Sequence, residues 1–446
     1  MKPIFEEERK FLEWKTGIQI PENCWRNGTK IYLNHFDKKP FLTFKVDLIN
    51  YDLIVKKYEK PIHKNYTIEE EYDEIRESLE ANYRLSVKKT KECIVKYKDY
   101  KMFVSISGGK DSDVMKFIVD KAIEELKNAG KEFKYNLIAF NTSNDSAHTY
   151  KYLKENHHMN KDNIISPNIG FYPWIINVKN YFTPTTFVRN CCSTYKEGQL
   201  SSVMNKDENT ITFLGMRRQE SNKRSFYDWD LNSSWIKHHK KKPNVPDNWE
   251  RFLPIVHWSD AEVWLFILHN KLKYNHMYNL GFNRVGCLIC PYSSDYTDLL
   301  IKYNYPKAWA RWVDILSKGY EIYGVEKRLK WSELEWCEGG KWKNATSKEY
   351  ELTTKKATDE RVKELAELKG ISEDLARKYF KKECSCGKKL NPGEVAMFLK
   401  LTGRYENQED ARQYLCKKCL SEKLGMTTKE YKEKMIEFTN QGCELF

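Results

Sequence analysis

A glycine-rich turn between an apolar strand and a helix constrains this chain more than any other feature. Residues 102–106 form a short apolar run typical of a strand, and an apolar stripe at helical spacing begins at Val114. Between them stand Ser107, Gly108, Gly109, Lys110, Asp111 and Ser112. The glycines let the backbone bend sharply and approach a ligand, and the amide groups at a helix start bind anions. The segment therefore predicts a phosphate-binding loop that opens a helix near Asp113, in preference to an ordinary strand-to-helix turn.

Strands and helices alternate on both sides of this loop. Apolar runs at 135–140 and 211–214 predict two further strands, and Ile211–Leu214 is followed by three arginines. Capping-box spacings at Thr67 with Glu70 and at Ser259 with Glu262 predict helix starts, the second helix ending near residues 269–270. This alternation predicts an α/β fold with a doubly wound, mostly parallel sheet.

The length of 446 residues fits roughly three domains, and local patterns suggest four segments. Residues 1–65 read as a small β-rich unit without an assigned task, and residues 66–300 hold the predicted sheet. Residues 301–380 are a helical extension, and residues 381–446 are a cysteine-rich tail. A helix from Pro306 is expected to end at Gly319, with Trp309 and Trp312 as core residues rather than base-stacking platforms.

Composition narrows the function classes. The strongly apolar run Val263–Leu268 is far shorter than the ~18–20 residues of a membrane span, so we expect a cytoplasmic protein without a membrane partner. The formal net charge of +13 points to a nucleotide or nucleic acid, although a lysine-rich background would give the same surplus. Eight of the twelve cysteines stand in close pairs, which in a reducing compartment usually bind metal.

The loop and two later segments resemble a known family. Ser-Gly-Gly-x-Asp-Ser after a buried strand is similar to the loop of the PP-loop ATP pyrophosphatases. Residues 215–224 resemble the Gly-x-Arg-x-x-Glu-Ser-x-x-Arg segment of the phosphoadenosine phosphosulfate (PAPS) reductase branch, which contains adenylyl-sulfate reductases and DndC-like DNA phosphorothioation sulfurtransferases. Residues 254–291 are similar to the C-terminal half of that branch.

The resemblance implies a site for ATP with Mg²⁺. Its nucleotide-binding residues would be Ser107, Gly108, Gly109, Lys110, Asp111, Ser112, Arg217, Arg218, Glu220, Ser221 and Arg224, of which Asp111, Ser112 and Arg224 would be catalytic. The residues themselves agree, because arginines at the carboxyl end of a parallel strand can pair with phosphate or sulfate oxygens. The loop at 141–145 departs from the Asp-Thr-Gly type of the family.

Two cysteine sets predict metal. Cys191, Cys192, Cys287 and Cys290 resemble the set that ligates a [4Fe–4S] cluster in the family, with zinc or unliganded thiols as alternatives. Lys196 and Arg189 are candidates for positive charge near that cluster or the substrate. A second set, Cys384, Cys386, Cys416 and Cys419, predicts structural zinc, against unliganded thiols. Cys443 lacks the family context of a nucleophile, so we expect a spare thiol.

Three functions remain open. The first is an ATP pyrophosphatase-type sulfurtransferase that adenylates its substrate for thiolation. Its acceptor would be DNA, tRNA or a small molecule. Its partner would be a cysteine desulfurase-type sulfur donor or a thiol reductant. The second is an adenylyl-sulfate or PAPS reductase that forms sulfite. The third is a nucleic-acid-binding or sensing module, in which the basic stretch 237–242 would contact a phosphate backbone rather than form a solvated loop. The intact loop favours the first, since reductases of the family keep a degraded loop.

Overall fold

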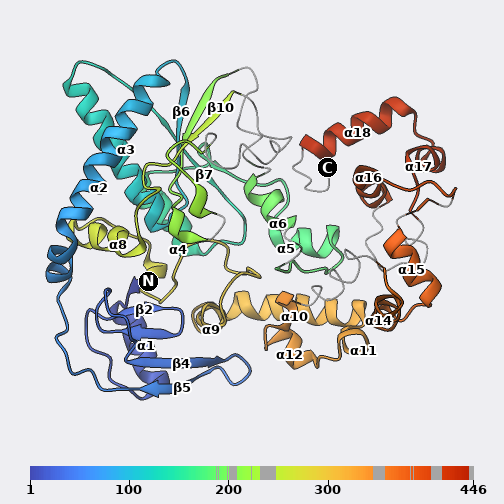
Figure 1. Cartoon of the computed structure of the whole chain (residues 1–446), viewed down its shortest axis with the longest axis horizontal. Helices are drawn as coiled ribbons and strands as arrows, with labels where there is room; N and C mark the ends of the chain where they lie inside the picture. The colour runs from blue at the N-terminus through green and yellow to red at the C-terminus, as the bar shows by residue number, and fades with distance from the viewer. Residues whose placement is uncertain are drawn as a thin grey trace. The chain divides into compact units, whose positions relative to one another are not determined.

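Two compact units make up the computed structural model (Figure 1). One comprises Met1–Gly170, Ser202–Ile289 and Ser293–Trp309, and the other comprises Phe171–Ser201, Cys290–Tyr292 and Ala310–Phe446. The structure describes residues 1–186, 188, 190–197, 199, 208–221, 224–231, 248–344, 357–381, 383–384, 386–402 and 414–440. The four-segment division of the chain stays a prediction.

The first unit begins with an antiparallel sheet of five strands. Its strands follow chain order: β1 (Lys2–Pro3), β2 (Trp25–Asn27), β3 (Lys30–Tyr32), β4 (Leu42–Asp47) and β5 (Asp52–Tyr58). Helix α1 (Glu6–Thr16) lies between the first two strands in sequence. The β-rich start is therefore confirmed, and its alternating burial along β4 shows one face turned to a core.

A parallel five-stranded sheet forms the centre of the same unit. Its spatial order is β10 (Trp249–Phe252), β9 (Thr210–Phe213), β6 (Lys101–Ser105), β7 (Asn136–Phe140) and β8 (Ile164–Ile165). Every pairing is parallel. The chain winds outward from β6 to β8 and then returns to the opposite side of β6, so the doubly wound sheet is confirmed. Ligands of such sheets bind where the winding direction reverses, beyond the carboxyl ends of the strands; here this point lies between β6 and β9.

Three helices of this unit pack together against the sheet core. They are α2 (Ile68–Lys96), α3 (Lys110–Asn128) and α8 (Asp260–His269), and Figure 1 shows α2 running beside α3. Their shared core includes Ile118 and Val263, which are fully buried. Both predicted capping boxes are present, at Thr67 and at Ser259. Two shorter helices, α4 (Ala147–His157) and α9 (Asp295–Asn304), also belong to this unit.

Helix α3 begins at Lys110, not near Asp113 as the sequence pattern predicts. Gly109 is its N-cap residue, with extended backbone angles. The last three residues of the glycine-rich segment therefore form the first helical turn. This places Asp111 and Ser112 at the end of the helix that carries partial positive charge.

The described part of the second unit is mainly helical. Its described α-helices are α5 (Phe171–Pro173), α6 (Asn190–Cys192), α11 (Val325–Leu329), α12 (Glu333–Cys337), α14 (Asp359–Lys369), α15 (Glu373–Lys381), α16 (Pro392–Thr402), α17 (Lys417–Leu424) and α18 (Thr428–Asn440). Helix α10 (Pro306–Tyr323) begins in the first unit and continues here. Trp312 is fully buried and contacts the rings of Phe171 and Trp342, so the tryptophans of α10 belong to the core, as predicted.

Gly319 lies inside α10 and does not end it, contrary to the prediction. A Cβ atom at this position would lie 2.8 Å from the backbone oxygen of Tyr181. Glycine therefore serves a close backbone approach here rather than a helix stop. None of the helices in the described ranges is both long and apolar enough to cross a membrane.

Candidate functional site

The glycine-rich loop lies at the reversal point of the parallel sheet, directly after β6. Gly108 has a φ of +73°, and a Cβ there would meet the Thr149 methyl group at 3.1 Å. The Ser112 hydroxyl donates to the Gly109 carbonyl at 2.7 Å and accepts the Ser107 amide at 3.3 Å. A strained position that only glycine adopts easily, tied by two serines, gives the loop one defined shape.

One side of the loop is held by the segment around the short 3₁₀ turn His276–Tyr278. The Tyr278 hydroxyl accepts the backbone amide of Lys110 at 2.9 Å, and the Asn275 side-chain amide donates to the Gly108 carbonyl at 3.2 Å. Burial raises the pKa of Tyr278 well above its usual value, and the neighbouring charge of Asp111 raises it further. Tyr278 therefore stays a neutral hydroxyl at neutral pH.

The other side of the loop is met by the end of β9. A Cβ on Gly215 would lie 2.7 Å from the Asp111 carbonyl oxygen and 2.9 Å from the Ser112 amide nitrogen. No side chain fits between these two backbones. The glycine that opens the 215–224 segment is thus explained by close packing against the first turn of α3.

Four alternating charges join the loop to β9 and α8. The Asp111 carboxylate accepts from Lys110 Nζ at 2.7 Å and from Arg217 Nε at 2.6 Å. The Asp260 carboxylate accepts from Arg217 Nη2 at 2.5 Å and lies 3.2 Å from Lys110 Nζ. Lys110 and Arg217 are buried. We call Lys110, Asp111, Arg217 and Asp260 the charge ring.

Ion pairing dominates the electrostatics of the ring. Burial acts to raise the pKa of Asp260, but the charges of Lys110 and Arg217 outweigh it and hold that pKa far below its usual range. Burial also acts to lower the pKa of Arg217, and the charges of Asp111 and Asp260 raise it instead. Asp260 and Arg217 are therefore both charged near neutral pH.

The remaining arginines of the 215–224 segment contact their own neighbours. Arg224 pairs with Glu220, and Ser221 Oγ accepts the Arg224 amide at 3.3 Å. Arg218 donates to the Tyr227 carbonyl and lies 3.7 Å from the Asp228 carboxylate. The structure gathers these residues on one connection after β9, in two short 3₁₀ turns. Their contact with phosphate stays a prediction.

The loop after β7 lies against the segment that carries Cys287. The Asn144 side-chain amide donates to the Ile289 carbonyl at 2.8 Å, and the Leu288 amide donates to the Asn144 carbonyl at 2.6 Å. Cys287 Sγ lies 3.5 Å from Thr142 Oγ1. The loop 141–145 thus meets the cysteine segment at the carboxyl end of β7. Sequence reasoning noticed the loop but assigned no role to Asn144.

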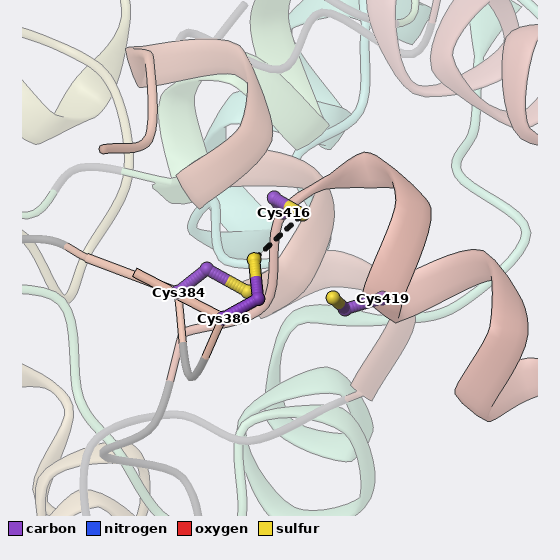
Figure 2. A group of neighbouring side chains, drawn as sticks. All are labelled: Cys384, Cys386, Cys416 and Cys419. Atoms are coloured by element: carbon purple, nitrogen blue, oxygen red, sulfur yellow. Dashed lines mark hydrogen bonds between the residues drawn. The ribbon is translucent and has the colours of Figure 1, made fainter. Parts of the chain in front are cut away.

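The two predicted cysteine sets differ in what the structure brings together. Cys287 belongs to the first unit and Cys191, Cys192 and Cys290 to the second; all four are partly exposed, and their grouping stays a prediction. The tail cysteines do meet: the sulfur atoms of Cys384, Cys386, Cys416 and Cys419 all lie within 4.8 Å of one another (Figure 2).

The sequence also singles out two basic residues, a basic stretch and one further cysteine. Lys196 is exposed, whereas Arg189, the stretch 237–242 and Cys443 lie outside the described residues.

The N-terminal sheet supplies support that sequence reasoning missed. Arg26 Nη2 donates to the Gly281 carbonyl at 2.5 Å and to Asn283 Oδ1 at 2.8 Å. Glu8 pairs with Arg26 and Lys2, and all three side chains are buried. Burial acts to raise the pKa of Glu8, but the charges of Arg26 and Lys2 lower it below its usual value. These contacts brace the 275–287 segment, which itself holds the glycine-rich loop through Tyr278 and Asn275.

Comparison with known proteins gives a family match over this region. Residues 101–293 match the model of the phosphoadenosine phosphosulfate reductase domain. A protein of Methanocaldococcus jannaschii, named only as uncharacterized, is 29% identical over 264 residues; the match covers 58% of this chain and 58% of that relative. An adenosine 5'-phosphosulfate reductase of Neisseria meningitidis is 30% identical over 105 residues, covering 23% of this chain and 36% of the enzyme. The chain thus spans less than two thirds of these relatives.

Solved structures resemble the chain weakly. The U34-tRNA thiolase NcsA from Methanococcus maripaludis, solved with its [4Fe–4S] cluster, is 17% identical with a TM-score of 0.29. The match covers 54% of this chain and 79% of that enzyme. Similarity at this level carries no argument about function.

Proposed function

Residues 101–293 form a domain of the phosphoadenosine phosphosulfate reductase family, and we propose that the chain is an ATP pyrophosphatase-type sulfurtransferase. In the proposed reaction, an oxygen of the acceptor attacks the α-phosphorus of ATP. The α–β bond breaks, AMP becomes joined to the acceptor oxygen, and pyrophosphate leaves. Sulfur then takes the place of that oxygen as AMP departs.

The observation that carries this proposal is the intact phosphate loop at the reversal point of the sheet. Its strained Gly108 and its two linked serines give a preformed turn, with the start of α3 facing the same side. The amide groups of a helix start favour an anion, and a loop that already has one shape loses little conformational entropy when it binds a ligand. We assign the β,γ-pyrophosphate of ATP to this loop.

The charge ring supports the same assignment. A triphosphate would compete with Asp111 and Asp260 for Lys110 and Arg217, which are the cations beside the loop. We infer that Lys110 and Arg217 pair partly with phosphate when ATP binds, and that Asp111 then orients the Mg²⁺ of the nucleotide. Guanidinium groups pair bidentately with phosphate, which suits this exchange. Arg224 and Arg218 would contact the phosphates from the connection after β9.

The central cysteines fit an iron–sulfur cluster by the chemistry of their donor set. Four thiolates are the ligands that a [4Fe–4S] cluster takes. Cys191, Cys192, Cys287 and Cys290 would hold it, and the cluster would carry sulfur or electrons for the second half of the reaction. Asn144 and Thr142 would position the Cys287 segment for this role.

The acceptor we favour is a nucleic acid, DNA or tRNA. The net charge of +13 supports an anionic partner. A cysteine desulfurase-type donor or a thiol reductant would be needed to supply sulfur or electrons.

The decisive experiment measures pyrophosphate and AMP release from ATP by anaerobically reconstituted protein, with and without tRNA or DNA. We expect release that depends on one of these acceptors. Asp111→Asn should lower kcat/KM roughly 100-fold, as loss of a transition-state contact does. The matched control Asp99→Asn, at an exposed turn outside the site, should keep wild-type turnover. Absence of AMP with every acceptor would contradict the proposal.

A second function is favoured by one observation. The curated relatives include adenosine 5'-phosphosulfate reductases, matched over part of the domain. The reductase hypothesis predicts sulfite from adenylyl sulfate in the presence of a thiol reductant, without pyrophosphate release. Sulfite formation by the wild-type chain would replace the first proposal with this one.

A further inference from the structure

The tail of the chain gathers four cysteines that the proposed reaction does not use. We propose that Cys384, Cys386, Cys416 and Cys419 bind a single zinc ion, and that this ion holds together the tail module (residues 383–384, 386–402 and 414–440). Figure 2 shows the four side chains converging from two separate stretches of the chain. The inference concerns a structural metal and does not depend on the proposed reaction.

Each stretch presents its pair of cysteines through a defined local structure. Cys384 and Cys386 lie on a tight turn closed by the bridge between Glu383 and Lys389. Within it the Cys384 amide donates to the Lys388 carbonyl at 2.8 Å, and Gly387 takes a φ of +82°. Cys416 is the N-cap of α17, and Cys419 follows in its first turn, so both face the same side.

The sulfur distances select a single ion over a cluster. A tetrahedral zinc ion with Zn–S bonds of about 2.3 Å places its sulfur ligands about 3.8 Å apart. The Cys386 and Cys416 sulfurs are 3.8 Å apart, and all four lie within 4.8 Å of one another. A [4Fe–4S] cluster needs wider spacing, because four irons and four sulfides stand between the thiolates. These four cysteines therefore suit one ion.

The tail module has little else to hold it together. Among its described residues, the buried core is Cys384, Leu390, Met397, Phe398, Leu415, Cys416, Leu420 and Tyr431. Two of these eight residues are proposed ligands. Small modules of this size usually need a metal or disulfides to be stable. The ion would supply the link between the turn and α17.

Polar contacts around the cysteines fit the same arrangement. Glu394 Oε1 accepts from Lys388 Nζ at 2.8 Å and from the Lys417 amide at 3.1 Å, which ties the turn to the start of α17. Lys388 stands two residues after Cys386 in the chain and brings a positive charge to this turn. Four thiolates with one divalent ion carry a net negative charge, which this lysine partly offsets.

The test is the zinc content of the full chain, purified without chelators and dialysed after incubation with Zn²⁺ alone. We expect about one tightly bound zinc per chain. Cys386→Ala should lose it; this side chain is exposed, so the substitution removes a ligand without opening a core. Cys337→Ala, at a buried cysteine of α12, is the matched control and should keep the zinc.

Three further measurements keep the inference falsifiable if a variant folds poorly. Cys419→His preserves a ligand and should keep the metal. When Co²⁺ replaces zinc in the wild-type chain, it should give the intense visible bands of tetrahedral thiolate coordination. Limited proteolysis after zinc removal should cut within 383–440 and leave residues 101–170 intact. Zinc-free wild-type protein, iron in place of zinc, or full zinc in Cys386→Ala would overturn the inference. AMP release is unaffected by any of these outcomes, so it tests the proposed reaction separately.

Discussion

Asp260 shows how strongly one residue of the charge ring depends on its partners. It lies at the start of α8, while Arg217 follows β9 and Lys110 opens α3. An unpaired buried charge costs several kcal/mol, whereas a paired one with good hydrogen bonds is tolerated. Each of these residues therefore depends on the others, and the loop geometry depends on all of them.

Removing the Asp260 charge should change how stability responds to acid. The pKa of Asp260 is held far below its unfolded value, because Lys110 and Arg217 outweigh the effect of burial. Below about pH 4, Asp260 binds a proton in the unfolded chain but stays ionised in the folded chain. The contribution of Asp260 to the free energy of unfolding is therefore present above that pH and is lost as the pH falls further. Asp260→Asn should be less stable at pH 7 and decline less steeply between about pH 5 and pH 2.

Urea unfolding at a series of pH values measures this slope, and Asp99→Asn is the control that should keep the wild-type slope. An Asp260→Asn slope equal to that of the wild type would contradict the electrostatic account of the ring.

At the scale of elements, the N-terminal sheet is a brace for the phosphate loop. Arg26 on β2 holds the Gly281 carbonyl, and Tyr278 and Asn275 of the same segment bind the loop backbone. A continuous set of hydrogen bonds thus connects β2, residues 275–281 and the start of α3. This gives residues 1–65 a physical task that their own sequence pattern does not reveal.

Arg26→Met should therefore affect both stability and the site. Its removal leaves the buried Glu8 with fewer partners, which costs about 3–5 kcal/mol in the free energy of unfolding. The 275–281 segment should also loosen, so KM for ATP should rise more than kcat falls. Denaturant unfolding and steady-state kinetics measure the two effects.

Arg76→Met on the exposed surface of α2 is the matched control, since its ion pair with Asp73 is solvent-accessible and contributes little. A stable Arg26→Met variant with an unchanged KM would show that the sheet does not act as a brace.

At the scale of the whole molecule, we expect the chain to divide eight of its cysteines between an iron–sulfur cluster and a zinc ion. The central set lies within residues 101–293, which match the family model, whereas the tail set lies within the small, mainly helical tail module. A [4Fe–4S] cluster needs its sulfur ligands farther apart than a single zinc ion does, so we expect the central set to hold the cluster and the tail set to hold zinc. The two centres should therefore be chemically independent.

Metal analysis of single variants tests this independence. Cys287→Ser should lose about four iron and four sulfide per chain and keep its zinc. Cys416→Ala should lose zinc and keep iron. The wild-type chain, reconstituted anaerobically, is the reference for both. Simultaneous loss of iron and zinc from either variant would contradict two separate centres.

Local patterns accounted for much of the fold. The capping boxes at Thr67 and Ser259 follow from contiguous residues, and the structure has them where predicted. The start of α3 and the interior position of Gly319 were predicted wrongly. In both cases a glycine was interpreted from its neighbours in sequence, whereas Gly109 is the N-cap of α3 and Gly319 allows the close approach of the Tyr181 backbone.

The sequence by itself determined the glycine-rich turn between a strand and a helix, the doubly wound parallel sheet and the pairing of cysteines along the chain. These depend on backbone freedom, apolar period and ligand type, which adjacent residues carry. Only the tertiary structure decided that Arg217 pairs with Asp111 and Asp260, that Arg26 braces Gly281, and that Cys384 and Cys386 meet Cys416 and Cys419. The physical reason is that ion pairs and metal sites form between whichever segments the packed elements bring within a few ångströms, and sequence spacing does not specify that proximity.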